Sequence, residues 1–169
     1  MKNTKHGGFF LPLITVLSLF VGGLRRQFCT ANDEGTTGRH SGSTTKLADA
    51  AFATRHLLVK IGSDSDHVNV TGAGDRPYGV TDDCPAAGGD PINVRFLTAS
   101  HGTKRLVATG AIAEDVDVYT APNGQVQPLP VAAGNYWHVG RTVRAAAQAG
   151  DGNYYVEVET YKPSQVVVE

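Results

Sequence analysis

The sequence is poor in the residues that cross-link or charge a folded protein. Its 169 residues include two cysteines, one methionine and one tryptophan, and only 18% are charged. Cys29 and Cys84 form no CxxC pair and match no zinc-ligand spacing, so we expect two unpaired thiols, with a disulfide as the alternative. This composition excludes a collagen, a coiled coil and an acidic disordered chain. The length excludes a large two-domain enzyme.

The chain also lacks a comfortable membrane span near its start. The apolar run Phe9–Val21 has 13 residues, which is short for crossing a bilayer. Lys2 and Lys5 precede this run, as in a secretory signal. Arg25 and Arg26 follow it and resist export. Three interpretations stay open for residues 1–30: a signal peptide, an assembly arm, or an extension that the fold does not use.

Charge and composition divide the chain into three predicted parts. Residues 1–30 are the apolar and basic segment, residues 31–45 form a Gly/Ser/Thr linker arm, and residues 46–169 form a β-rich domain. Residues 1–60 hold eight Lys/Arg against three Asp/Glu, whereas residues 61–169 hold seven against thirteen. Nucleic-acid binding needs positive charge on a folded face, so this acidic body argues against it. A basic tail on an acidic body suits assembly with an acidic partner.

The body predicts a mainly β fold, because its apolar runs are short, alternating and bounded by turns. We expect a small β-barrel or sandwich of short antiparallel strands with one short helix, preceded by an extended N-terminal arm. Expected strands are Leu57–Ile61, His67–Thr71, Ile92–Leu97, Arg105–Thr109, Val116–Thr120, Gln125–Leu129 and Tyr154–Tyr161. The segment Leu47–Ala53 could instead form one or two helical turns.

Two local patterns are more specific. Asn123-Gly124 supplies the positive φ angles of a tight hairpin turn between two strands. Pro128 and Pro130 then end the return strand or leave it at an edge. The alanine-rich segment Arg141–Ala149 predicts the short helix, which Gly150 would stop.

No pattern in the sequence predicts catalysis. There is no GxSxG elbow and no phosphate-binding GxxxxGK[ST] loop. Asp64–His67 clusters metal-ligating residue types, but Asn69 stands where a calcium loop needs glycine, so a solvated turn is expected. The six histidines show neither HxH nor HxxxH spacing. We therefore predict no catalytic, cofactor-binding or metal-binding residues, and no cofactor.

Two aromatic residues are candidates for a protein interface. Tyr136 and Trp137 stand together, and a tryptophan is either a core anchor or a binding hot spot. The core is the default expectation for Trp137.

The second half of the body resembles the capsid cement, or head decoration, proteins of tailed bacteriophages. The resemblance is carried by Gly110–Tyr119, Asn123–Val126, Val139–Ala146, Ala149–Asp151 and Val156–Val158. Upstream, Lys46–Ala51, Leu57–Lys60 and Arg76–Val80 are also similar to the start of such domains. Gly152-Asn153 and the apolar N-terminal run depart from the family pattern.

This resemblance implies a non-enzymatic virion protein on the outer surface of a capsid assembled in the host cytoplasm. Such a protein binds the major capsid protein, self-associates as a trimer or dimer, and clamps neighbouring capsid subunits. A polar arm can add a strand to a neighbour's sheet. The residues expected to contact the capsid are Arg39, His40, Ser41, Thr44, Thr45 and Lys46. The alternatives are a secreted or membrane-tethered β-domain that binds protein or carbohydrate, and a small hydrolase with an unrecognised site.

Overall fold

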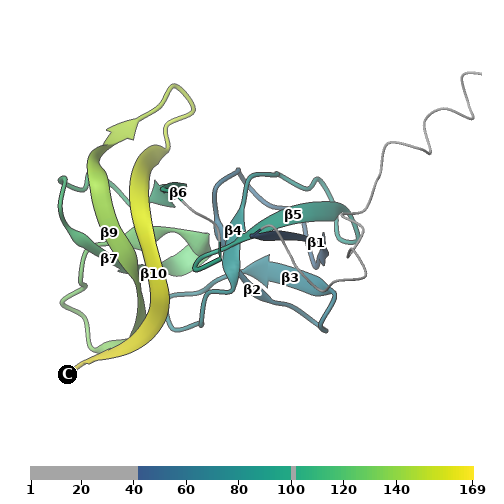
Figure 1. The fold of residues 1–169 in the computed structure, drawn as a ribbon, viewed down its shortest axis with the longest axis horizontal. Helices are drawn as coiled ribbons and strands as arrows, with labels where there is room; N and C mark the ends of the chain where they lie inside the picture. Colours follow the sequence, from purple (N-terminus) through teal and green to yellow (C-terminus); the bar gives the residue numbers. More distant parts are fainter. Residues whose placement is uncertain (1–41, 100–101) are drawn as a thin grey trace, which may run out of the picture. The chain divides into compact units, whose positions relative to one another are not determined.

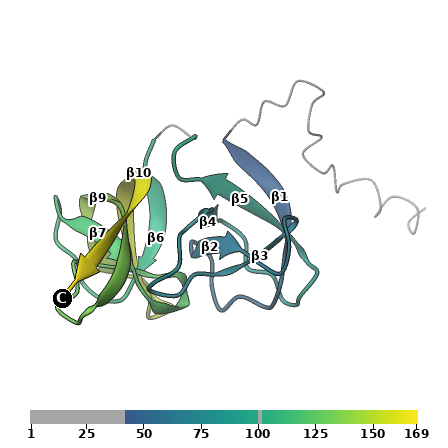
Figure 2. The same cartoon turned by 90° about the horizontal axis from the view of Figure 1, so that it is seen from below.

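The computed structural model describes residues 42–99 and 102–169. Their regular structure consists of β-strands joined by turns and loops (Figures 1 and 2). Two closed barrels follow one another along the chain. The first has the strand order β1-β3-β2-β4-β5, with bounds β1 Ser43–Ala48, β2 Leu58–Ile61, β3 His67–Val70, β4 Gly79–Thr81 and β5 Pro91–Phe96. The second has the order β10-β6-β8-β7-β9, with bounds β6 Lys104–Ala108, β7 Asp117–Thr120, β8 Val126–Gln127, β9 Gly134–Gln148 and β10 Tyr154–Val168.

The mainly β barrel prediction is confirmed, but two of its details are wrong. The strands are not all antiparallel, because β1 pairs with β3 and β6 pairs with β8 in parallel. They are also not all short, since β9 and β10 each have 15 residues. Within the described ranges, no helix has the length and apolar character needed to span a bilayer.

The predicted helix at Arg141–Ala149 is wrong, because all of this segment except Ala149 belongs to β9. Alanine has the highest helix propensity, but tertiary context routinely overrides propensity, and β9 pairs along most of its length with β10. Gly150, which was expected to stop the helix, lies instead in the turn between β9 and β10. In the same turn, the amide of Gly152 donates to the Ala149 carbonyl at 3.0 Å, and Gly152 has a φ of 84°. Turn chemistry and cross-strand pairing therefore outweigh local helix propensity.

The hairpin prediction at Asn123-Gly124 is confirmed. Both residues have positive φ, 60° and 70°, in the turn η2 Pro122–Gly124. Tyr119 and Thr120 of β7 pair with β8 on either side of it. The return strand stops after two residues, immediately before Pro128, as a residue without an amide hydrogen requires.

The first strand, β1, begins at Ser43, three residues before the expected boundary at Lys46. The segment Ser43–Leu47 pairs antiparallel with β5, and the amide of Phe96 donates to the Gly42 carbonyl at 2.9 Å. The sequence predicted a linker here because this stretch is short and polar. Its backbone is satisfied inside the barrel, so it is not available to extend a partner's sheet.

The described residues form two apolar clusters, and each cluster takes residues from both barrels. One cluster contains Leu57 and Val59 of the first barrel and Val107 of β6. The other cluster contains Leu58 of the first barrel and Leu106 of β6. Side chains alternate along a strand, so this segment of β2 and β6 each contribute to both cores.

The Asn123-Gly124 turn is held against the first barrel. The Gly124 amide donates to the Thr71 carbonyl at 2.8 Å. A Cβ at Gly124 would lie 2.7 Å from the Leu58 carbonyl oxygen and 2.7 Å from Val70 Cγ1. Glycine is needed here both for its left-handed backbone and for this close approach.

Replacing Gly124 with valine is therefore expected to destabilise the fold by about 2–4 kcal/mol, from left-handed backbone strain and overpacking. Urea denaturation measures the loss. Gly110→Ala is the control, because a Cβ there meets nothing within 4 Å, and its effect should stay within about 0.5 kcal/mol. Equal stability of the two variants would contradict the assigned role of the turn.

Truncation tests where the fold begins. A chain that starts at Lys46 loses three β1–β5 residue pairs that a chain starting at Gly42 keeps. At about 1 kcal/mol for each lost hydrogen bond, the shorter chain should unfold at least about 2 kcal/mol more easily. Parallel urea titrations of the two chains provide the measurement, and superimposable curves would restore the boundary at Lys46.

Candidate functional site

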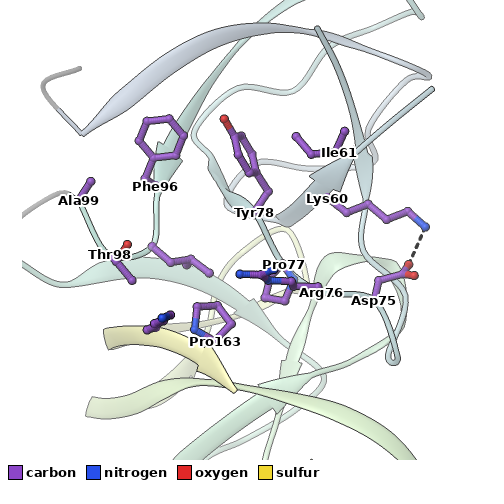
Figure 3. A pocket seen from close by; sticks show the side chains of 12 residues that line it. Lys60, Ile61, Asp75, Arg76, Pro77, Tyr78, Phe96, Thr98, Ala99 and Pro163 are labelled. Atoms are coloured by element: carbon purple, nitrogen blue, oxygen red, sulfur yellow. Dashed lines mark hydrogen bonds and ion pairs between the residues drawn. The ribbon is translucent and has the colours of Figure 1, made fainter. Parts of the chain in front are cut away.

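A cavity lies where the first barrel meets the bulged part of β10 (Figure 3). Its volume is about 780 Å³. The lining combines apolar and cationic side chains: Lys60, Ile61, Asp75, Arg76, Pro77, Tyr78, Phe96, Leu97, Thr98, Ala99, Lys162 and Pro163. We call this cavity the β10 pocket.

Aromatic and aliphatic side chains form one wall of the β10 pocket. The rings of Tyr78 and Phe96 meet edge to face, with centroids 5.3 Å apart, an arrangement that aromatic pairs prefer. Ile61 is 43% exposed beside them, and Pro163 of β10 stands opposite Tyr78 and Phe96 in Figure 3. Burial raises the pKa of Tyr78 above its usual range, so its hydroxyl stays protonated.

The rim of the β10 pocket is mainly cationic. Lys60 Nζ lies 2.7 Å from Asp75 Oδ2, and Asp75 also accepts the Gly72 amide at 2.7 Å. The lysine first, and then this amide, lower the pKa of Asp75 below its usual value. Arg76 and Lys162 add two more positive charges. The pocket therefore suits a ligand that pairs a carboxylate with an apolar side chain.

The rim connects to one of the predicted interface aromatics. Arg76 lies over the Trp137 ring, 5.8 Å from its centroid, and Trp137 Nε1 donates to the Gly74 carbonyl at 3.1 Å. Trp137 is thus half-buried against the loop that carries Arg76. Tyr136 is only 8% exposed, and its hydroxyl donates to the Ala132 carbonyl at 3.2 Å. Tyr136 is therefore a core residue with little surface to offer a partner.

The predicted arm residues separate into two groups. Arg39, His40 and Ser41 lie outside the described residues. Thr44, Thr45 and Lys46 belong to β1. Thr44 is buried, and Lys46 Nζ donates to the Ser65 carbonyl at 2.6 Å. The second group therefore builds the first barrel, contrary to the expectation of an arm ordered only by a partner.

The Asp64–His67 cluster forms the turn expected of it. Asp64 Oδ1 accepts the amides of Asp66 and His67 and lies 2.7 Å from His67 Nδ1. This hydrogen bond raises the pKa of His67 and lowers that of Asp64. Among the described residues, no group of three or more His, Cys, Asp or Glu could hold a metal ion.

The residues that line a second cavity of about 430 Å³ include His56, Cys84, Arg105, Asp151 and Tyr155. Cys84 donates to the Phe52 carbonyl at 3.1 Å, whereas His56 Nδ1 lies 3.1 Å from Asp82 Oδ1. An activated thiol needs a base within hydrogen-bond reach. Here the thiol and the imidazole are each directed to a different partner.

His56 connects the two barrels under backbone strain. Its φ is 62°, in a region that residues other than glycine adopt at a cost. Its amide donates to Thr81 of β4 at 2.8 Å, and its carbonyl accepts the Val107 amide of β6 at 3.1 Å. Asp82, which binds its ring, also accepts Arg95 Nη2 at 2.9 Å. Burial is the main cause that lowers the pKa of His56.

Sequence reasoning missed most of the β10 pocket. Arg76–Val80 contributed to the family resemblance, but nothing marked Tyr78 as a pocket residue. Phe96 looked like one more apolar residue of an alternating strand. Lys162 and Pro163 lay beyond the expected end of the last strand. Lys-Pro within a strand-rich segment does favour a bulge or an edge, and this signal could have directed attention to the site.

Comparison with protein-family models finds no match, and comparison with curated proteins finds no similar sequence. The site is therefore interpreted from its own geometry.

His56 gives the fold a predictable pH dependence. Because the folded state lowers its pKa below 6.5, the unfolded chain binds the proton more readily, and stability falls as the pH drops below that value. Between about pH 7.5 and pH 5, the wild type should lose more stability than His56→Asn, whose asparagine tolerates a positive φ.

Urea midpoints measured at each pH provide the comparison. His67 acts in the opposite direction, because its raised pKa stabilises the fold at low pH and this contribution is lost as the pH rises. It is present in both proteins and cancels in their difference. A difference between the two proteins that does not change with pH would contradict the role assigned to His56.

Proposed function

We propose that the chain is a non-enzymatic structural protein that binds the outer surface of a phage capsid and stabilises contacts between major capsid subunits. The proposal starts from the resemblance to head decoration proteins, which extends over both barrels. It assigns the folded body a mechanical role and no reaction.

The main support for the proposal is the position in the fold of the residues that carry the resemblance to decoration proteins. Gly140 is one of them, and a Cβ there would collide with the Glu159 carbonyl oxygen. Asn123-Gly124 forms the turn that packs against the first barrel. Such residues specify how strands approach one another. The resemblance therefore concerns the construction of a barrel, which supports a shared architecture with decoration proteins.

Mechanical demands on a clamp also suit this fold. Closed barrels leave few unpaired strand edges, and interleaved cores resist deformation because protein interiors are close-packed. The β10 pocket offers an apolar wall and positive charge, which favour binding of a protein segment.

Arg39, His40 and Ser41 remain the proposed capsid contacts of the arm. Thr44, Thr45 and Lys46 are already paired within β1, so contact would depend on the residues before Ser43. A protein on a symmetric lattice binds many identical sites, so modest contacts at each can add up.

One sequence feature favours the alternative of a secreted or tethered binding domain. The apolar run Phe9–Val21 resembles a signal peptide. The mass of the mature protein separates the two hypotheses, because export predicts loss of the first residues, whereas decoration predicts a protein associated with particles.

Binding to capsids tests the proposal directly. The full chain is mixed with expanded capsids built from the major capsid protein encoded in the same genome, and particles are sedimented. We expect saturable co-sedimentation and a higher capsid melting temperature. A chain that starts at Gly42 should bind at least about tenfold more weakly, a loss of about 1.4 kcal/mol.

A charge reversal inside the full chain sharpens the test. Arg39→Glu should weaken capsid binding. Arg144→Glu should not, since this side chain is 77% exposed on β9 and makes only a long ion pair of 3.7 Å with Glu157. No binding of the full chain to any capsid form would overturn the proposed function.

A further inference from the structure

β10 carries an unusual edge. Its first part, Tyr154–Val158, pairs with β6 on one side and β9 on the other. Its last part, Ser164–Val168, pairs with β9 alone. In the part of the chain that the structure describes, no strand covers the second edge of Ser164–Val168. We call these five residues the β10 edge.

The β10 edge lacks the usual protection against pairing. Natural edges carry lysine, proline or a bulge, and here all three stand just before the edge, at Lys162 and Pro163. The edge itself is Ser-Gln-Val-Val-Val, and Val167 is 64% exposed. A β-branched sequence with open backbone donors and acceptors is a template for another strand.

From this geometry we infer that the β10 edge pairs antiparallel with the same edge of a second copy, and that the end of each strand enters the other copy's β10 pocket. The inference concerns self-association and does not depend on the proposed function.

Symmetry selects the register. Two identical antiparallel edges are related by a twofold axis perpendicular to the sheet, which keeps every side chain on its own face. Residues of equal parity must then face each other. The β10 edge satisfies this over its full length with Val166 on the axis, so that Ser164 faces Val168 of the second copy and Gln165 faces its Val167.

This register brings complementary charges together. The residue after the edge, Glu169 of the second copy, then lies opposite Pro163. At this point three residues of β10 oppose one of β9, and the bulge lets Lys162 and Pro163 both line the β10 pocket. The incoming Glu169 meets the cationic rim formed by Lys162 and Arg76. Val168 precedes it and supplies the apolar side chain that the pocket wall suits.

The interface is small, so a weak dimer is expected. Two five-residue strands and the Glu169 contacts bury less than the about 1,200–2,000 Å² of a stable complex. We expect a dissociation constant in the micromolar range, measured on the full chain by sedimentation equilibrium over a wide concentration range.

A charge swap tests the contact between edge and pocket. Lys162→Glu and Glu169→Lys should each weaken the dimer by about tenfold. The double variant should recover part of this affinity, because the exchanged charges at 162 and 169 remain complementary while Arg76 keeps its positive charge. Arg144→Glu is the matched control and should leave the dimer unchanged. Two weakened single variants without recovery in the double variant would overturn this contact.

Cross-linking tests the register. In a background of Cys29→Ser and Cys84→Ser, Val166→Cys should form an intermolecular disulfide, because facing side chains in antiparallel strands have Cβ atoms about 4.5–5.5 Å apart. Val131→Cys, at a residue that is 99% exposed, reports random collisions and should cross-link far less. A chain that stays monomeric, or equal cross-linking at both positions, would overturn the inference.

Discussion

The constraint on which the rest of the structure depends is the packing that residues 57–59 and β6 share in two apolar cores, which we call the seam. Leu57 and Leu58 point into different cores, as do Leu106 and Val107. Neither barrel therefore closes its interior alone, since each takes side chains from the other. Small β domains bury little surface on their own, so sharing cores across the seam makes one larger folding unit from two small barrels. His56 holds this seam by its backbone, which explains why its strained conformation is retained.

Two further hydrogen bonds also join the second barrel to the first. Gly124 brings the β7–β8 turn onto Thr71 of the loop after β3, and Trp137 binds Gly74 from β9. Both reach the same loop of the first barrel, which continues into Arg76 and the β10 pocket. The pocket rim is therefore fixed by packing from the second barrel. A rim held in this way loses little conformational entropy when it binds.

Alternation and turn chemistry were sufficient to predict most strands, because β2, β3, β5, β6 and β7 are half-buried and bounded by turn residues. They failed where long-range pairing decides the conformation. Ser43–Thr45 is polar and becomes a strand only because β5 lies beside it. Arg141–Gln148 is rich in alanine and is extended because β10 pairs with it. The sequence did not predict the β10 pocket for the same reason. Its residues come from separate segments of the chain, which the fold brings together.

The bulge of β10 links the closed and the open part of the second barrel. Up to Val158 the strand is paired on both edges, and from Glu159 onward it pairs with β9 only. Proline cannot donate a ladder hydrogen bond, so Pro163 is tolerated where the pairing with β6 has already ended. At the same bulge, Lys162 and Pro163 join Tyr78 and Phe96 in the lining of the β10 pocket. The free edge begins where β6 ends its pairing, at Val158, and the bulge that follows adds Lys162 and Pro163 to the pocket lining. An open backbone and an apolar, cationic cavity therefore lie within reach of a single extended segment.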